Sequence, residues 1–327
     1  MNIYSLTLKY LFDLKACQTW EELRSLLEQA GSTKPQHWQL PHIADLAVGA
    51  DISRIIPGIA AIACHYASII MVDDMLDEDP KGIYHQMGQA ITANYVMALQ
   101  ATGFDAIQQS DHDDRTKGTA LHSLNRMLFI TTRGQHLDIQ NPQNEECYWA
   151  TISTKSAPFF GTSMYVGAML GGAAPETAAQ IERIGKLYGE MIQIHDDLHD
   201  VMECPANPDW ITNRSPLPIL YAQVVAHPDR ERFIALRQDI VAPGALHEAQ
   251  AILIRCGAVS YAIYHLLQRY RTAQAILDNT ILFDRSPIDH LLGALVEPIP
   301  ELMVLAGADQ APSDIVSAML AQLNPVV

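Results

Sequence analysis

The sequence lacks the cysteine patterns of disulfide-stapled and zinc-binding proteins. Its five cysteines are odd in number, lie far apart and form no CxxC pair. Neither a disulfide framework nor a zinc ribbon is therefore expected. The first residues also lack a basic segment followed by a long apolar core and a small-residue cleavage site. We therefore expect no signal peptide and a cytoplasmic location.

Positive charge is scarce as well. The 21 lysines and arginines face 37 aspartates and glutamates, so the formal net charge is −16 and the pI is near 5.1. Nonspecific nucleic-acid binding depends on clustered lysine and arginine, and no basic run is present. Nucleic acid is therefore not an expected partner.

One stretch without charge raises the question of a membrane span. Residues 55–72 contain no aspartate, glutamate, lysine or arginine, and their number touches the range for a transmembrane helix. The stretch includes Pro57, Gly58 and His65, however, and leads directly into the acidic segment DDMLDED. A buried helix that ends at a polar site fits better, so we expect no transmembrane segment.

Good strand candidates are few, and internal repeats and Gly/Ser linkers are missing. Hydrophobic residues make up 49% and aromatic residues only 7%, a mixture that favours helices around a sizeable core. We predict an all-α fold: one large helical bundle over residues 1–300 and a short helical appendage over 301–327. Apolar periodicity and helix stop signals predict helices at about 2–30, 52–78, 84–109, 119–139, 144–170, 175–203, 217–226, 229–239, 244–279, 286–296 and 311–323, with a polar loop at 110–118 and an irregular segment at 204–216.

Two clusters of aspartate carry the chemical signal. Asp73 and Asp77 share a helix face because residues four apart do so, and Asp74 lies beside them. Like charges at that spacing destabilise a helix unless a cation neutralises them. Carboxylate oxygens suit Mg²⁺, which usually bridges to substrate phosphates. A single cluster of this kind is most often a solvated helix face.

The second cluster changes that balance. The segment QIHDDLHD repeats the pattern late in another long apolar helix, with Asp196 and Asp200 on one face and Asp197 beside them. Two such helices facing each other would form a cage for several magnesium ions and one diphosphate. His195 and His199 flank this cluster with the spacing of a transition-metal pair, although packing beside the acids is the simpler interpretation.

Three further segments follow in a recognisable order. They are GQHLD at 134–138, KSA at 155–157 and DWITNRSPLP at 209–218. With the two aspartate clusters, these segments resemble the motifs of the trans-isoprenyl diphosphate synthase, or polyprenyl synthetase, family. In that family the corresponding motifs are GQxxD, K-[TS]-[GA] and DxxxGKxTLP, with Arg214 here in the place of the last motif's lysine. The resemblance covers about residues 40–290.

The resemblance implies a bundle of long helices around a deep pocket, with Mg²⁺ at its mouth. Three ions are expected with diphosphate bound, and a homodimer through long helices is possible. It implies that Asp73, Asp77 and Asp196 bind metal; that Asp74, Asp197 and Asp200 support them, directly or through water; that Lys155, Arg214 and Lys81 bind diphosphate; and that Gln135 and Gln193, with Lys155, steady the reacting groups. The plainer interpretations are a surface lysine at Lys155 and a helix hydrogen-bonding residue at Gln193.

The sequence departs from the family on the side that binds isopentenyl diphosphate. The family's GGKRLRP segment is replaced by HWQLPH at 37–42, and its Arg-Arg-Gly is replaced by DPKG at 79–82. A diphosphate needs several cationic donors because its desolvation is costly. We therefore predict that the allylic half of the site is kept and that the isopentenyl half is degraded, unless His42, His85 or Lys81 substitutes.

Residues just upstream of the first aspartate cluster limit product length in the family. Here Ala67 and Ser68 are small and Ile69 is of medium size, which predicts room for a longer chain. Met71, Tyr66 or Tyr95 would close that pocket if it lies against them. We therefore take Ser68, Ile69 and Tyr95 as candidate pocket residues.

The main functional prediction is Mg²⁺-dependent ionisation of an allylic isoprenoid diphosphate, followed by transfer of the prenyl group to an unusual acceptor. An aromatic, a sugar lipid and a peptide side chain are all open. The alternative is a terpene synthase on the same fold, which cyclises or quenches the cation with no second substrate. A non-catalytic partner subunit is less expected because both aspartate clusters are intact. A di-iron bundle is disfavoured because no ExxH pair occurs.

Overall fold

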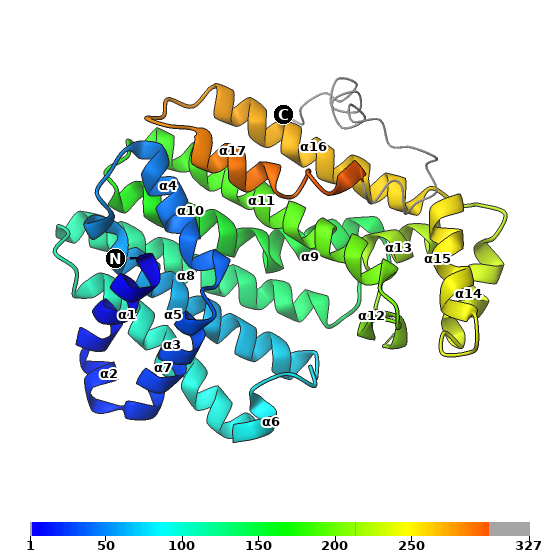
Figure 1. Ribbon diagram of the computed structural model, residues 1–327, viewed down its shortest axis with the longest axis horizontal. Coiled ribbons are helices and arrows are strands. Elements are labelled where there is room, and N and C mark those ends of the chain that lie inside the picture. Colours follow the sequence, from blue (N-terminus) through cyan, green and yellow to red (C-terminus); the bar gives the residue numbers. More distant parts are fainter. Residues whose placement is uncertain (1, 213, 301–327) are drawn as a thin grey trace.

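The computed structural model describes residues 2–212 and 214–300, and every regular element in that part of the chain is a helix (Figure 1). The all-α prediction is confirmed. The expected helix at 311–323 and the proposed appendage lie outside the described residues. In chain order the elements are α1 (Ile3–Asp13), α2 (Lys15–Thr19), α3 (Glu21–Ser32), the 3₁₀ helix η1 (Gln36–Gln39), α4 (Leu40–Val48), α5 (Ile52–Leu76), α6 (Tyr84–Met87), α7 (Gln89–Gln108), α8 (Asp114–Asp138), α9 (Glu145–Lys155), α10 (Ala157–Leu170), α11 (Pro175–Met202), α12 (Pro208–Ile211), α13 (Leu217–Val224), α14 (Arg230–Gln238), α15 (Ala245–Arg255), α16 (Ala258–Asp278) and α17 (Ser286–Gly293).

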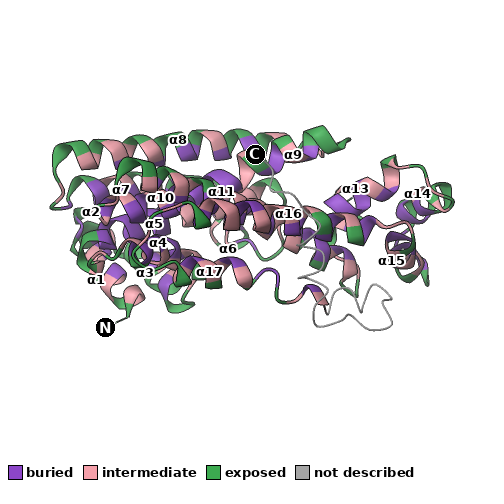
Figure 2. Ribbon diagram, turned by 90° about the horizontal axis from the view of Figure 1, so that it is seen from above, coloured by how far each residue is buried: buried purple, intermediate pink, exposed green. Residues whose placement is uncertain are grey.

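Long helices form the centre of the bundle. The largest packing interfaces join α10 with α11, α5 with α7, and α11 with α16. Figure 2 shows that the inward faces of these helices are buried, while the outer faces of α7 and α8 are largely exposed. The helices α1, α2 and α3 cover one end of the bundle, and α14 and α15 lie at the opposite end (Figure 1).

The helix α5, which contains the uncharged stretch 55–72, is part of this core. By length and composition it is the one single helix in the described residues that is able to cross a membrane, with a mean hydropathy of 2.0 over its most apolar window. However, 72% of that window is buried inside the protein. Ile55, Ile59 and Ile62 are fully buried in the core. The helix therefore has the burial of a core helix rather than of a lipid-facing one.

Several predicted boundaries are wrong for local reasons. The segment 144–170 forms two helices that meet at Ser156, because Pro158 in the first turn of α10 has no N–H to continue the ladder of α9. The segment 244–279 is likewise divided, at Gly257, which has φ +85°. The helix α8 begins inside the predicted loop 110–118 because the Asp113 carboxylate accepts a hydrogen bond from Thr116 N at 3.0 Å.

The first 50 residues are also more divided than predicted. The single helix expected at 2–30 is three helices, interrupted where Leu14 and Trp20 take extended backbone conformations. The helices η1 and α4, at 36–48, were not expected from periodicity. The irregular segment 204–216 contains the short helix α12. The helices η1 and α4 matter because they form one wall of the cavities described below.

Candidate active site

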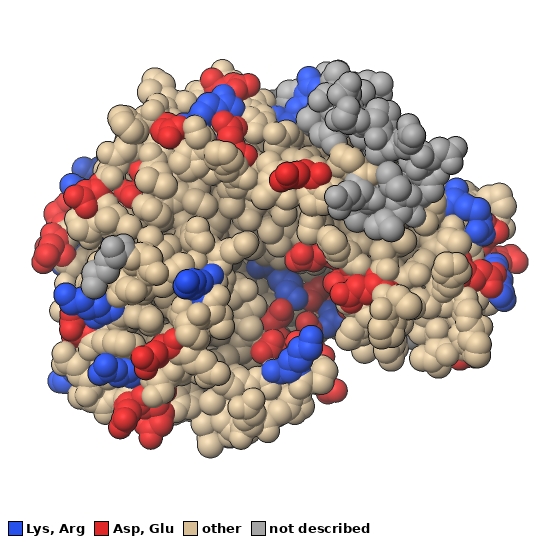
Figure 3. Space-filling view, viewed as in Figure 1, with Lys and Arg blue, Asp and Glu red and all other residues tan. Residues whose placement is uncertain are grey.

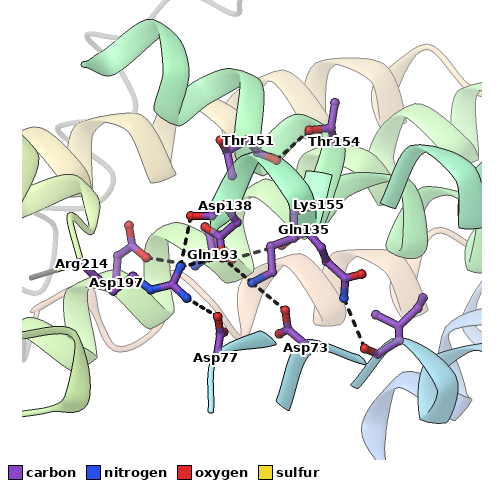
Figure 4. Close-up of polar contacts among 12 residues, drawn as sticks. Asp73, Asp77, Gln135, Asp138, Thr151, Thr154, Lys155, Gln193, Asp197 and Arg214 are labelled. Atoms are coloured by element: carbon purple, nitrogen blue, oxygen red, sulfur yellow. Dashed lines mark hydrogen bonds and ion pairs between the residues drawn. The ribbon is translucent and has the colours of Figure 1, made fainter. Parts of the chain in front are cut away.

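Four segments bring polar side chains together at one place. The C-terminal part of α5 carries Asp73, and Asp77 caps that helix. The last residue of α8 is Asp138 and the last residue of α9 is Lys155, while Arg214 follows α12. Figure 4 shows these side chains pointing toward one another. Residues that are 141 positions apart in the sequence therefore meet because helix ends converge.

The two cations are held directly by the carboxylates. Lys155 Nζ lies 2.9 Å from Asp73 Oδ1 and 2.7 Å from Asp138 Oδ2. Arg214 Nη1 lies 3.1 Å from the same Asp138 oxygen, and Nη2 pairs with Asp77 (Figure 4). Burial alone would lower the pKa of the Lys155 ammonium, but Asp138 and Asp73 raise it above its usual value. Both side chains are therefore cations placed beside the first aspartate cluster.

Asp138 is the residue that sequence reasoning missed. It joins Lys155 and Arg214 through one carboxylate oxygen, so it fixes the position of both cations. The signal was present, because Asp138 ends the GQHLD segment that contributed to the family resemblance. It was not assigned a role because the importance of its position depends on contacts from two distant segments.

Gly134 allows this arrangement. A Cβ atom at that position would overlap the backbone of Thr154 and Lys155, which belong to the neighbouring helix α9. Helices α8 and α9 can therefore approach closely only if residue 134 has no side chain. The glycine of the GQHLD segment thus determines where the Lys155 side chain begins.

Asp197 is buried and has a different environment from its neighbours. Its Oδ2 accepts hydrogen bonds from Tyr148 Oη and Leu217 N, each at 2.7 Å, and its Oδ1 accepts one from Gln193 Nε2 at 3.0 Å. Burial raises the pKa of Asp197 to about 6, against the effect of these three donors. Asp197 therefore ties α9 and the start of α13 to α11.

Gln193 extends this contact toward the other helices. Its Oε1 accepts a hydrogen bond from Ser156 Oγ at 3.1 Å, one residue after Lys155. Gln193 thus links the hydroxyl between α9 and α10 with the Asp197 carboxylate (Figure 4). The arrangement supports a positioning role for Gln193 beside Lys155.

Asp200, Asp74 and Asp196 lie outside the ion pairs that Lys155 and Arg214 form. Burial raises the pKa of Asp200 to about 7, with further contributions from Asp209 and Asp196. Burial and the neighbouring Asp79 and Asp73 raise the pKa of Asp74 to about 6. The side chain of Asp196 is 58% exposed, with His195 Nδ1 3.6 Å from Oδ1. These groups therefore leave negative charge that a bound cation would neutralise.

The donor set fits Mg²⁺ with a phosphate ligand better than it fits an all-protein metal cage. Within residues 2–212 and 214–300, no three His, Cys, Asp or Glu side chains are close enough together to hold an ion. Mg²⁺ is commonly bound through one or two carboxylates, waters and substrate phosphates. Asp73, Asp77, Asp196 and Asp200 supply only oxygen donors of that kind, so the chemistry of the residues present agrees with this ion.

The other predicted residues lie elsewhere. Gln135 donates to the backbone oxygen of Ile69 at 3.3 Å and so joins α8 to α5. Ser68 is buried and donates to the His65 carbonyl, while Tyr95 stacks on Trp20 with ring centroids 5.2 Å apart. Lys81 is exposed and lies near Asp74 rather than near the Lys155 cluster. The structure thus does not bring Lys81 together with Lys155 and Arg214.

Three cavities adjoin the aspartate helices, and Figure 3 shows a hollow where acidic and basic side chains gather. The polar cavity, of about 170 Å³, is lined by residues that include Asp77, Asp138, Lys155 and Arg214. The α3 cavity, of about 510 Å³, is lined by Leu26, Trp38, Ile70, Asp74, Lys81 and others. The α11 cavity, of about 350 Å³, is lined by Gln36, His37, Gln39, Leu40, Ile43, Tyr66, Phe160, Tyr188, Ile192, Asp196 and Leu291.

Comparison with known proteins gives a consistent result. A family model described as polyprenyl synthetase matches residues 43–239. The short chain isoprenyl diphosphate synthase of Methanothermobacter thermautotrophicus is 28% identical over 254 residues, which cover 71% of this chain and 76% of that protein. The geranylgeranyl diphosphate synthase of Methanosarcina mazei is 22% identical over 168 residues, covering 49% of this chain and 52% of that protein.

Solved structures share the fold. Geranylgeranyl pyrophosphate synthetase from Pyrococcus horikoshii superposes with a TM-score of 0.77 at 20% identity, covering 90% of this chain and 94% of that chain. Polyprenyl synthase from Caulobacter crescentus, complexed with calcium and isoprenyl diphosphate, gives 0.74 at 19% identity, covering 90% and 93%. With the aspartate helices, Lys155 and Arg214 gathered at one site, these matches identify the chain as a member of the polyprenyl synthetase family, whose members are prenyltransferases.

Proposed function

We propose that this protein ionises an allylic isoprenoid diphosphate in a Mg²⁺-dependent step and transfers the prenyl group to an acceptor other than isopentenyl diphosphate. The observation that carries the proposal is the contrast between two parts of one site. Lys155 forms an ion pair with Asp73, and Arg214 forms one with Asp77. Among the described residues that line the two cavities next to η1, Lys81 is the one lysine or arginine.

The first part of the site supports ionisation. Three magnesium ions, held by Asp73, Asp77 and Asp196, would supply positive charge to the leaving diphosphate when bound. The Lys155 ammonium and the Arg214 guanidinium would exchange a carboxylate partner for a diphosphate oxygen and so bind the departing group. Asp138 would keep both cations in position during that exchange. The bond between the allylic carbon and oxygen then breaks with its electron pair on the diphosphate.

The second part does not favour another diphosphate. Lys81 is the one lysine or arginine among the described residues that line the α3 cavity, and the α11 cavity has none. His37 lines both cavities, but burial lowers the pKa of its imidazole to about 3, so it is neutral at neutral pH. Burying a diphosphate without several cationic partners is costly. This supports an acceptor without phosphate.

A terpene synthase activity has one supporting observation. Aromatic rings follow one another from α5 through α10 to α11. The ring centroids of Tyr66 and Phe159 are 5.2 Å apart, those of Phe159 and Phe160 are 5.4 Å apart, and those of Phe160 and Tyr188 are 5.4 Å apart. The faces of aromatic rings stabilise cations. A cation formed beside Asp73 and Asp196 would meet this series whether it reacts with an acceptor or folds on itself.

Product analysis separates these activities. Purified protein and Mg²⁺ are incubated with geranyl, farnesyl and geranylgeranyl diphosphates, with and without isopentenyl diphosphate, and products are identified by mass spectrometry. Diphosphate release without chain elongation is the expected result. Elongated diphosphates that appear only with isopentenyl diphosphate would contradict the degraded second site. Hydrocarbon or alcohol from the allylic substrate alone would favour the terpene synthase.

A cytoplasmic homodimer completes the proposal. Met97 on α7 and Phe129 on α8 are 70% and 72% exposed, and Ile91 on α7 is 53% exposed, so these two helices offer exposed apolar side chains to a second copy. Sedimentation analysis of the protein and of Phe129→Asp tests the arrangement. A dimer that the charged substitution dissociates is expected, whereas a monomeric native protein would refute it.

A further inference from the structure

The α11 cavity holds chemistry that the ionisation step does not use. It lies between η1, α4 and α5 on one side and α10 and α11 on the other, and Asp196 stands at its edge. Asp196 is the one charged side chain among the described residues that line it. Since the proposed function assigns Asp196 to Mg²⁺, an anionic occupant would find no lysine or arginine among the described lining residues to pair with. The occupant is therefore uncharged in the part that enters the cavity.

The walls of this cavity are rich in aromatic side chains, which suit a flat ring. Tyr66, Phe160 and Tyr188 all line it, and the Phe160 and Tyr188 rings meet edge to face with centroids 5.4 Å apart. The imidazole of His37 stacks on the Tyr66 ring with centroids 3.3 Å apart. Aromatic pairs favour offset-stacked and edge-to-face contacts. A volume of about 350 Å³ lies within the range of small-ligand sites, and a one- or two-ring aromatic fits that size.

Two hydroxyl groups give the cavity a polar side. Within the described part of the chain, the hydroxyls of Tyr66 and Tyr188 have no hydrogen-bond partner, and neither oxygen is fully buried. Burial, with Asp196 as a further cause, raises the pKa of Tyr188 to about 12, so the hydroxyl stays protonated. Hydroxyls in a half-buried site usually find a partner. A ligand hydroxyl or ring N–H would provide one.

We propose that the α11 cavity binds an uncharged, electron-rich aromatic acceptor that carries a hydroxyl or ring N–H, held between Tyr66 and Tyr188. This assignment rests on the proposed ionisation of an allylic diphosphate at the same site. The cavity adjoins both aspartate helices, because Tyr66 lies two helical turns before Asp73 on α5 and Tyr188 lies two turns before Asp196 on α11. The ring therefore reaches the place where the cation forms.

The transfer step balances without any further reactant. The allylic carbon–oxygen bond breaks and its electron pair leaves with the diphosphate. An electron pair of the aromatic ring then forms the new carbon–carbon bond to the allylic carbon. The substituted ring carbon loses its proton, which restores aromaticity, and a diphosphate oxygen takes that proton. The products are a prenylated aromatic and diphosphate.

The first test is direct binding. Calorimetric titration of the full-length protein with 1-naphthol and with indole measures occupancy, and 1-naphthoate serves as a charged analogue. In the absence of Mg²⁺, we expect 1-naphthol to bind at least tenfold more tightly than 1-naphthoate, because the described lining residues include Asp196 and no lysine or arginine that could pair with a carboxylate. Failure of both 1-naphthol and indole to bind, or equal binding of the naphthoate, would overturn the proposal.

The second test locates the binding. Tyr188→Phe keeps the ring and removes the hydroxyl, and is expected to weaken 1-naphthol binding about fivefold to tenfold. Tyr264→Phe is the matched control, because Tyr264 lies on α16, is 41% exposed and does not line the cavity. If the two variants bind 1-naphthol equally well, the ligand does not lie against Tyr188.

The third test is turnover, with diphosphate release and product mass measured in the same tube. We expect geranyl or farnesyl diphosphate, Mg²⁺ and 1-naphthol or indole to give a prenylated ring together with released diphosphate. Diphosphate release with only hydrocarbon or alcohol products would overturn the aromatic acceptor and leave the ionisation intact. If no tube releases diphosphate, the proposed function fails, and the binding measurements still decide whether the cavity takes an aromatic ligand.

Discussion

The two sides of the site differ in how completely their polar groups are paired. On the α8 and α9 side, the Lys155 and Arg214 side chains and the Asp138 and Asp197 carboxylates all have protein partners. On the η1 and α4 side, buried His37 Nε2, His42 Nδ1 and both Asp45 carboxylate oxygens have no hydrogen bond. One side is a closed network of ion pairs and hydrogen bonds. On the other side, His42 Nδ1 and Asp45 Oδ2 form a looser pair at 3.5 Å, and the buried His37 Nε2 has no hydrogen bond.

This difference predicts where substitutions are tolerated. A network in which one carboxylate holds two cations tolerates little substitution, because losing one member leaves the others buried and unpaired. A wall of neutral rings imposes no such mutual dependence. The side that carries Lys155 and Arg214 has the segments that resemble the family motifs, whereas the η1 side has HWQLPH in place of the family's GGKRLRP.

The largest expected effect comes from removing a cation on the charged side. Lys155→Gln should lower kcat/KM for diphosphate release about 10²- to 10³-fold, because a preorganised cation beside the leaving group is lost. Lys186→Gln is the control, since Lys186 pairs with Glu182 on the same helix and lies outside the polar cavity. Similar losses in both variants would show that helix stability, not leaving-group binding, explains the effect.

Replacing Gly134 tests how closely the charged side is packed. Gly134→Ala should lower the free energy of unfolding by about 1–3 kcal/mol, because the added methyl overlaps the backbone at Thr154 and Lys155. Gly118→Ala, in the same helix with open space around it, should be neutral or slightly stabilising. Urea unfolding of both variants measures the difference, and equal effects would contradict the close approach of α8 and α9.

Acid should destabilise the protein through His37, which lies on the η1 side of the site. The pKa of folded His37 is about 3 against a usual 6.5, so below about pH 6.5 the unfolded chain takes up a proton that the fold does not. Stability is therefore lost as pH falls from about 6.5 toward 3, by about 1–3 kcal/mol at pH 4.5. The His37→Gln variant should not show this loss of unfolding free energy between pH 7 and 4.5. The variant His122→Gln, at an exposed position, should lose as much as the native protein. Identical pH dependence in all three would refute the burial argument.

The smallest expected effect comes from adding a positive charge beside the cavities next to η1. Gln36 is exposed and lines both the α3 and the α11 cavities. Gln36→Arg should tighten isopentenyl diphosphate binding about threefold to tenfold, by adding one charge-assisted contact. Gln238→Arg adds the same charge at an exposed position on α14. If calorimetry gives the same affinity for both variants, the cavities beside η1 are not where that diphosphate binds.

Long periodic segments were predictable from the sequence, and short ones were not. The expected helices at 52–78 and 175–203 agree closely with α5 (Ile52–Leu76) and α11 (Pro175–Met202), because both carry long, regular apolar patterns. The helices η1 and α4 escaped because four and nine residues are too few to show a period. Ser156 and Gly257 divide helices whose apolar spacing continues across the break.

The site was predictable as a set of residues but not as an arrangement. Helical spacing placed Asp73 with Asp77 and Asp196 with Asp200, and motif order brought in Lys155 and Arg214. No local pattern states that Asp138 joins both cations or that Asp197 faces Tyr148, because those contacts depend on where distant helix ends meet. The metal and pocket assignments stay predictions.

The amide of Leu217 offers a built-in reporter. Its N–H is hydrogen-bonded to a buried carboxylate oxygen of Asp197, and the segment that joins these two residues carries Arg214. Hydrogen–deuterium exchange at that amide requires its hydrogen bond to Asp197 to break. The exchange rate therefore measures how often the start of α13, three residues after Arg214, separates from α11. Under the proposed function a bound diphosphate should slow this opening, so one backbone proton would report on ligand binding beside Arg214.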